Sequence, residues 1–398
     1  MDNFFVISLI KSGLVAAVFL TLLAYLQWVE RKVLAHIQLR PGPYRVGPHG
    51  LLQPLADVIK LLTKEGFIPA NVNTFFYLLA PFLAVTIALI SISVIPFGPQ
   101  IEVFGVKTNM GLTDLGIGIL FILALSSVGV YGVALAGWAS NSKYALLGGL
   151  RSAAQMISYE LPMALALVAP LLMLNTLNLR EMVNLQDGFV FGLLPRWTIF
   201  QYPFPQALSF IVFLICAFAE TNRVPFDLPE AENELVAGFH TEYSSMSFAA
   251  FFMAEYANMI TVTSVATLLF LGGWHPLFPT EYGSWLIPVL LFIGAGLISI
   301  SHGLSPARPF DRITLPVFGV IFIALGLLFA APFAQPYVLP LFWFAAKAGA
   351  LLFLFIWIRG TLPRFRYDQL MGFAWKFMFP LALINLLITA FAVSATTN

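Results

Sequence analysis

Long apolar runs recur along the whole chain and are separated by short polar stretches. A helix needs about 20 apolar residues to cross the hydrocarbon core of a bilayer. Runs of that length predict ten transmembrane helices, near 5–28, 74–96, 111–138, 155–175, 206–222, 248–272, 285–303, 314–332, 341–359 and 375–394. Because these runs follow one another closely, we predict a single transmembrane domain over 1–398, an all-α polytopic membrane protein.

The composition supports a membrane protein and excludes several other classes. Apolar residues make up 60% of the chain and charged residues 10%, whereas a soluble domain carries about 25% charged residues. The net charge of +1 provides no field that would attract nucleic acid, so we expect no nucleic-acid partner. The single cysteine, Cys216, excludes a disulfide within the chain.

The basic residues predict the orientation of the chain. Fifteen of the 20 Lys and Arg residues fall in one set of alternate loops, and the positive-inside rule places these loops in the cytoplasm. With ten crossings, both termini then lie on the opposite side of the membrane.

Two loops on the predicted cytoplasmic side have distinctive patterns. Within the loop 29–73, the segment 51–65 places its aliphatic residues on one helical stripe, which predicts an amphipathic helix on the cytoplasmic interface. The loop 221–247 is acidic, and Arg223 is its only Lys or Arg. A solvated acidic face would have this composition, but the alternation of apolar residues, prolines and charge over 224–229 favours a docking surface or a cavity rim.

Ionisable side chains inside predicted spans are costly to insert and are therefore candidates for function. They are Lys11, Asp114, Glu160, Glu220, Glu255 and Lys347. From the helical rise of about 1.5 Å per residue, the three glutamates fall in the predicted cytoplasmic half of the bundle. Grouped carboxylates can pass protons, which predicts a relay of Glu160, Glu220, Glu255, Asp114 and Lys347. The alternative is that each charge is paired across helices and fixes their packing; Asp114, three residues into its predicted helix, also suits the helix dipole.

The sequence lacks the patterns of a resident cofactor. The five histidines fall in loops or at the ends of spans, whereas membrane haem needs His pairs that face each other inside helices. No Cys, His and acidic residues have the spacing of metal ligands. We therefore expect no metal, haem, flavin or iron–sulfur cluster in this chain and no catalytic centre in this chain alone.

Three motifs resemble one family. The first combines Glu30-Arg31-Lys32 with QLRPGP at 38–43 and QPLAD at 53–57. The second is AETNRVPFDLPEAE at 219–232, and the third is RGTLPRFRYDQLM at 359–371. Over roughly 1–274 and 340–398, the chain resembles the H subunit of NADH-quinone oxidoreductases, the membrane subunit of respiratory complex I that forms the quinone chamber.

This resemblance implies a function, a substrate and partners. Such a subunit forms the membrane side of a quinone-binding chamber and couples quinone reduction to proton translocation through buried glutamates. The substrate is a quinone, ubiquinone or menaquinone. The partners are the soluble iron–sulfur-carrying arm and the antiporter-like membrane subunits, in a bacterial inner membrane.

The resemblance also assigns residues. Matching positions place in the quinone chamber and its loop Glu30, Arg31, Arg40, Asp57, Glu220, Arg223, Phe226, Asp227, Glu230, Glu232 and Glu234. Glu160 and Glu255 match the buried row of glutamates.

The region 275–339 departs from the family pattern, in which a short loop follows the turn at Gly272-Gly273-Trp274. Here two apolar runs are joined by 305–313, which predicts an added transmembrane hairpin. Arg308 and Arg312 place its tip on the cytoplasmic side.

Two alternative functions remain at this point. One is the homologous membrane subunit of a hydrogenase or ferredoxin-linked complex, which need not reduce quinone. The other is a free-standing ion transporter, for which an internal repeat and paired broken helices would be typical, and the sequence shows neither.

Overall fold

The computed structural model describes residues 2–103, 106–190, 194–227, 236–279, 283–305 and 310–397. In these ranges nine helices are long and apolar enough to cross a membrane. They are α1 (Asp2–Ile37), α3 (Thr74–Ile92), α4 (Gly118–Ala139), α5 (Lys143–Leu174), α9 (Ser245–Phe270), α10 (Leu286–Leu304), α11 (Asp311–Ala330), α12 (Gln335–Thr361), and the continuous run of α13 (Tyr367–Phe373), η4 (Ala374–Met378) and α14 (Phe379–Thr397). The all-α polytopic architecture is confirmed.

The predicted span 206–222 is the one that forms a shorter helix. It forms α7 (Ala207–Glu220), whose 14 residues extend about 21 Å, less than the roughly 30 Å of a hydrocarbon core. The helix ends because Asn222 adopts a left-handed conformation (φ 50°), which turns the backbone N–H of Arg223 back to the carbonyl of Phe218. The expected ten full spans are therefore nine in the described ranges, plus this short apolar helix.

Helix α4 begins at Gly118 rather than near 111, because the preceding residues form a loop. In that loop, Thr113 donates from both its backbone N–H and its hydroxyl to the carbonyl of Ser93. Asp114 thus lies before the helix, and the prediction that it occupies the first helical turn is wrong.

Short strands and a small helix on the predicted outer side were not expected from the hydrophobic pattern. β1 (Gln100–Val103) pairs antiparallel with β2 (Val106–Asn109), and β3 (Phe189–Val190) pairs with β4 (Leu194–Pro195). Helix α6 (Leu179–Leu185) begins after Asn178, whose side chain accepts hydrogen bonds from the N–H groups of Arg180 and Glu181.

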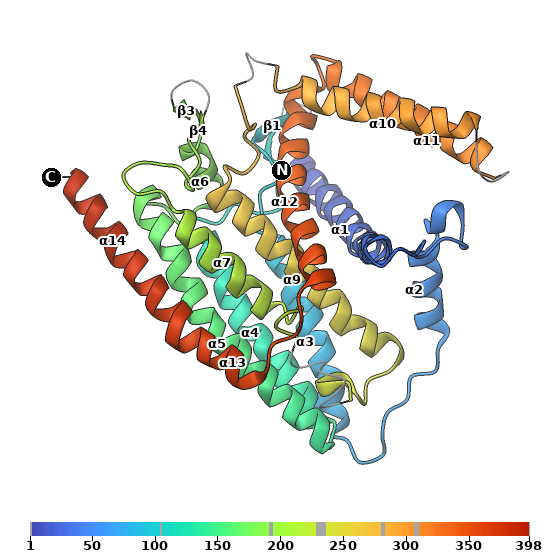
Figure 1. Ribbon diagram of the computed structural model, residues 1–398, viewed down its shortest axis with the longest axis vertical. Coiled ribbons are helices and arrows are strands. Elements are labelled where there is room, and N and C mark those ends of the chain that lie inside the picture. Colours follow the sequence, from blue (N-terminus) through green and yellow to red (C-terminus); the bar gives the residue numbers. More distant parts are fainter. Residues whose placement is uncertain are drawn as a thin grey trace.

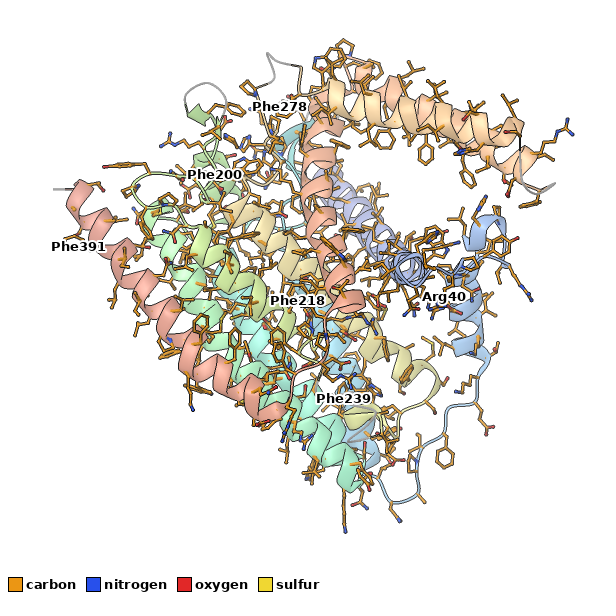
Figure 2. All side chains as sticks on the ribbon, viewed as in Figure 1. Arg40, Phe200, Phe218, Phe239, Phe278 and Phe391 are labelled. Atoms are coloured by element: carbon orange, nitrogen blue, oxygen red, sulfur yellow. The ribbon has the colours of Figure 1, made fainter. Side chains whose placement is uncertain are left out.

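Helix α5 packs against α4, α7 and α14 (Figure 1). Helix α3 packs on α4 and α9, and α12 packs on α9 and α1. Helices α4 and α5 approach closely because Gly137 has no side chain. A Cβ atom at this position would lie 2.5 Å from the carbonyl oxygen of Ala145. On the other side of α7, Phe218 stacks on Phe355 of α12 with ring centroids 3.8 Å apart (Figure 2).

The segment expected to be an amphipathic helix at 51–65 forms α2 (Gln53–Thr63), preceded by the short helix η1 (Pro48–Gly50). Figure 1 shows α2 to one side of the bundle. Its aliphatic stripe is exposed in the isolated chain.

The inserted region forms the antiparallel helices α10 and α11, the added hairpin, which extends away from the start of α12 (Figure 1). Its helices pack backbone to backbone because Gly296 has no side chain. A Cβ atom at this position would lie 2.7 Å from the carbonyl oxygen of Gly319. At the outer end, Phe329 stacks on Phe292 and meets Phe342 of α12 edge to face.

Candidate functional site

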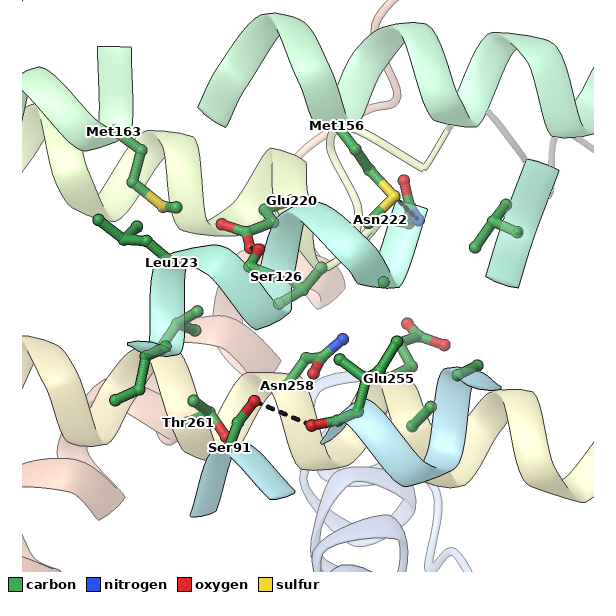
Figure 3. Close-up of a pocket in the computed structure, with 18 of the residues that line it drawn as sticks. Ser91, Leu123, Ser126, Met156, Met163, Glu220, Asn222, Glu255, Asn258 and Thr261 are labelled. Carbon is green, nitrogen blue, oxygen red and sulfur yellow. Dashed lines mark hydrogen bonds between the residues drawn. The ribbon is translucent and has the colours of Figure 1, made fainter. Parts of the chain in front are cut away.

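A cavity of about 1120 Å³, including the space at its mouth, lies between α3, α4, α5, α7 and α9. Most of its lining is apolar, and its polar lining residues are Ser91, Ser126, Glu220, Thr221, Asn222, His240, Glu255, Asn258 and Thr261. Figure 3 shows Glu220 with Ser126 on one wall and Glu255 with Asn258 on the facing wall. Two of the three glutamates predicted to form a relay therefore line one cavity.

Consecutive serines of α4 hold the glutamates on the α5–α7 side. Ser126 donates a hydrogen bond to Glu220, and Ser127 donates one to Glu160 of α5. Glu220 is buried at the last position of α7, and Glu160 is half-buried. The three glutamates thus come from three helices, α5, α7 and α9, that surround or adjoin the cavity.

Arg223 connects the cavity to α1. Its Nη1 lies 3.1 Å from Oε1 of Glu30, and its Nε lies 2.5 Å from Oε1 of Glu255. Its guanidinium also lies over the ring of Tyr256, at 4.4 Å from the centroid. Arg359 of α12 pairs with the same Glu30.

The electrostatics of Arg223 follow from these contacts. Burial alone would lower its pKa, but the carboxylates of Glu255 and Glu30 raise the pKa above its usual value. Arg223 is only 4% exposed and stays charged. The structure places Arg223 against Glu30 and Glu255.

The other residues assigned to the chamber form separate pairs near α2 and α12. Arg31 lies 2.7 Å from Asp57 and so ties α1 to α2. Asp227 lies 2.9 Å from Arg364. The ring of Phe226 stacks on Phe365, with centroids 5.6 Å apart.

Arg40 is exposed on the α1–α2 side of the molecule, where its Nε donates to the side chain of Gln38 (Figure 2). The remaining predicted chamber residues, Glu230, Glu232 and Glu234, lie outside the described residues.

The structure places Asp114 and Lys347 away from the cavity lining. Asp114 pairs with Arg180 and accepts a hydrogen bond from Asn178, both on the outer loop that holds α6. Lys347 donates to the carbonyls of Leu271 and His275 at 2.6 and 2.8 Å, at the end of α9. These contacts support the packing alternative for both residues.

Lys11, the remaining ionisable residue of a predicted span, donates from its Nζ to the hydroxyl of Thr108 at 3.2 Å. The contact joins α1 to the outer strand β2.

Several hydrogen bonds around the cavity were not identified from the sequence. Besides Ser126 and Ser127, Gln155 of α5 is fully buried and donates to the carbonyls of Ala219 and Phe226, each at 2.7 Å. The side-chain amide of Gln155 therefore bonds both ends of the stretch 219–226, which is the first part of the motif 219–232. An amide inside an apolar helix was the only available signal.

The C-terminal part of the acidic loop 221–247 contacts α2. The hydroxyl of Ser245 lies 2.9 Å from the carbonyl oxygens of both Leu61 and Lys64, at the end of α2. Just before it, Tyr243 stacks on Tyr77 of α3, with centroids 4.2 Å apart. Helix α2 is therefore joined to the bundle at its C-terminal end.

The added hairpin also reaches this region. Nε2 of His49, in η1, lies 3.2 Å from Oδ1 of Asp311, the first residue of α11. The hairpin thus contacts the segment that leads into α2.

Among the described residues, no cluster of three or more His, Cys, Asp or Glu side chains has a geometry that could hold a metal ion. The polar groups at the cavity are two carboxylates, several hydroxyls, two amides and the imidazole of His240. Carboxylates and imidazoles can bind and release protons, while hydroxyls and amides form hydrogen bonds.

Comparison with known proteins shows the family of this chain. A family model described as NADH dehydrogenase matches residues 10–390. The chain is 66% identical to an H subunit of the NADH-quinone oxidoreductase of Solibacter usitatus, over 100% of this chain and 99% of the relative. It is 48% identical to an H subunit from Koribacter versatilis, over 98% of both chains, and 46% identical to the H subunit from Protochlamydia amoebophila, over 93% of both. With nine long apolar helices in its described part, the chain is a multi-pass membrane protein that belongs to the family of NADH-quinone oxidoreductase H subunits.

Proposed function

We propose that this protein forms the membrane side of a quinone-binding chamber and couples quinone reduction to proton translocation. The observation that carries the proposal is the double pairing of Arg223. One carboxylate, Glu30, belongs to the residues that the family motif assigns to the chamber. The other, Glu255, lines the cavity that also contains Glu220.

Reduction of a quinone to a quinol takes up two electrons and two protons, so the chamber carries added negative charge from the arrival of the electrons until the two protons have been supplied. A change of charge near Glu30 alters the balance between the two carboxylates that share Arg223. When Arg223 is drawn towards Glu30, Glu255 loses its cation and binds a proton more readily. Glu255 can then exchange that proton across the cavity with Glu220, and Glu220 with Glu160.

The partners follow from the same assignment. The chain is a subunit of an enzyme complex, and we propose that the soluble iron–sulfur arm supplies the electrons while antiporter-like membrane subunits take up the coupling. The location that suits these partners is a bacterial inner membrane. The names of the relatives favour this function over a hydrogenase-linked subunit or a free-standing transporter.

The test uses the assembled complex in proteoliposomes, with Glu160→Gln and Glu255→Gln. Each variant keeps the shape of the side chain but removes a group that titrates. We expect quinone reduction coupled to pumping to fall at least about tenfold. NADH oxidation by a soluble artificial acceptor should persist, because it does not need this membrane protein.

The matched control is Glu181→Gln, which alters an exposed carboxylate of α6 bonded to Thr176 at 2.6 Å. It should leave both activities unchanged. Full coupled activity in Glu160→Gln and Glu255→Gln would leave these glutamates with only a packing role and would overturn the relay.

A further inference from the structure

Ser126 and Ser127 are neighbours in α4, yet their hydroxyls reach different helices. Consecutive helical residues point about 100° apart, so adjacent side chains do not face each other. Ser126 reaches Glu220 at the end of α7, and Ser127 reaches Glu160 in α5. One turn of α4 therefore holds two carboxyl groups that belong to separate helices.

The hydroxyl of Ser127 has two acceptors within reach. Besides Glu160, its Oγ lies 3.1 Å from the carbonyl oxygen of Leu123, one turn earlier in α4. A serine hydroxyl has one proton to donate and two lone pairs to accept with. When Glu160 is ionised, Ser127 can donate to it. When Glu160 is protonated, it can donate to Ser127, whose own proton then turns to Leu123.

This arrangement matters in a membrane. A buried polar group without a hydrogen bond costs several kcal/mol in a hydrocarbon environment. Because Ser127 can act as donor or acceptor, Glu160 keeps its bond in both protonation states, and no helix has to move when a proton arrives or leaves.

Glu220 has a different but complementary surrounding. One oxygen, Oε1, accepts from Ser126. The other, Oε2, is buried and has no hydrogen-bond partner among the described residues, and Glu220 lines the cavity. Ser126 therefore fixes one oxygen, while the second is left to bind a proton.

We propose that Ser126 and Ser127 are positioning residues. They bond Glu220 of α7 and Glu160 of α5 to the single helix α4, so that the two carboxyl groups keep their separation while protons move. This inference rests on the proposed function, because it assigns a role within the same relay. It names α4, which contributes no ionisable side chain to the cavity, as the support of the relay.

The test uses the assembled complex in proteoliposomes, with Ser126→Ala and Ser127→Ala measured singly and together. There are two readouts. One is the coupled turnover, normalised to the amount of complex, and the other is the number of protons pumped per electron. We expect each change to lower coupled turnover by about tenfold, the size expected for loss of one hydrogen bond to a charged group. We also expect a lower ratio of protons to electrons.

Two controls separate positioning from packing. Ser126→Thr and Ser127→Thr keep the hydroxyl and should restore coupling. Thr263→Val removes a buried hydroxyl of α9 that bonds only to carbonyls of its own helix, at 2.8 and 3.0 Å, and should leave coupling unchanged. If an Ala variant fails to assemble, the Cys variant at that position decides, since a thiol has similar volume and is a weak donor.

The outcomes are distinct. Wild-type coupling in the Ala variants, together with lost coupling in Glu160→Gln and Glu220→Gln, would overturn the role of the serines and leave the proposed function intact. Wild-type coupling in the glutamate variants as well would overturn both. Equal losses in the Ala, Thr and Thr263→Val variants would show a packing effect and would also overturn the inference.

Discussion

Nε of Arg223 lies 2.5 Å from Oε1 of Glu255 on α9, while Nη1 of the same guanidinium bonds both carboxylate oxygens of Glu30 on α1. Arg223 itself follows the end of α7. A single side chain thus connects three helices that are far apart in the sequence. Its planar fork of N–H donors can satisfy two carboxylates at once, whereas a lysine ammonium acts as a point charge.

We therefore expect Arg223→Lys to impair the complex and Arg223→Ala to impair it more. Removing one partner of a buried ion pair costs about 3–5 kcal/mol, because the other charge stays buried. The measurements are the thermal stability of the purified complex and its kinetics with a short-chain quinone. The control is Arg366→Lys, because Arg366 and Asp368 form an exposed pair at 3.4 Å that contributes little. An Arg223→Lys variant with wild-type stability, kcat and KM would show that the double pairing has no role.

The tip of the added hairpin should be close to the segment before α2. We expect His49→Cys and Asp311→Cys to be cross-linked by a short bismaleimide in native membranes, because these side chains lie 3.2 Å apart. The native Cys216 is buried and should not react. The pair Asp187→Cys and Asp311→Cys should give no cross-link, since Asp187 lies in an exposed position on the predicted outer side.

The same variants test orientation. An impermeant thiol reagent should label Asp187→Cys and Asp311→Cys from opposite sides of the membrane. Labelling of both from one side would contradict the topology predicted from the basic residues.

Lys347 should matter for stability rather than for proton transfer. In Lys347→Met, the carbonyls of Leu271 and His275 lose their donor at the end of α9, at a cost of about 1–3 kcal/mol. The cation–π contact with Trp197, at 4.4 Å, is lost as well. We expect less assembled complex and a lower melting temperature, with an unchanged number of protons per electron. A reduced proton ratio at normal stability would instead place Lys347 in the relay.

Ser245 should hold the end of α2 in place. Ser245→Ala removes the donor to the carbonyls of Leu61 and Lys64, so we expect faster amide hydrogen exchange in the last turn of α2. Thr63→Val is the matched control, because that hydroxyl bonds only to carbonyls within α2. Equal exchange in both variants would show that the contact from Ser245 does not restrain the helix.

Hydrophobic runs located the helices because crossing a membrane demands a minimum length of apolar sequence. They located the helix ends less well. The loop before α4 is apolar enough to extend the run, so Asp114 was placed inside a helix that begins only at Gly118. Helix α5 begins at Lys143, earlier than the predicted span at 155, because the first turns, which contain Gly148, Gly149 and Arg151, are also helical.

The sequence predicts the depth of the site residues in the membrane, but it does not predict which face of each helix they occupy. Counting residues placed Glu160, Glu220 and Glu255 on the same side, and the structure brings Glu220 and Glu255 to one cavity. Residue counts do not show which face of a helix meets which neighbour. The partners Ser126 and Ser127 were missed for this reason, since serines are ordinary residues in a membrane helix.

Helices α10 and α11 add two crossings between α9 and α12. Because two helices are added, the chain returns to the side of the membrane where α9 ends. Helices α12 and α14 therefore run in the same directions as they would if α9 were connected directly to α12. A single inserted helix would have inverted them and carried Arg359 to the membrane face opposite its partner Glu30. Parity therefore limits how this protein can lengthen at this turn: helices can be added in pairs without disturbing the ion pairs beyond the insertion.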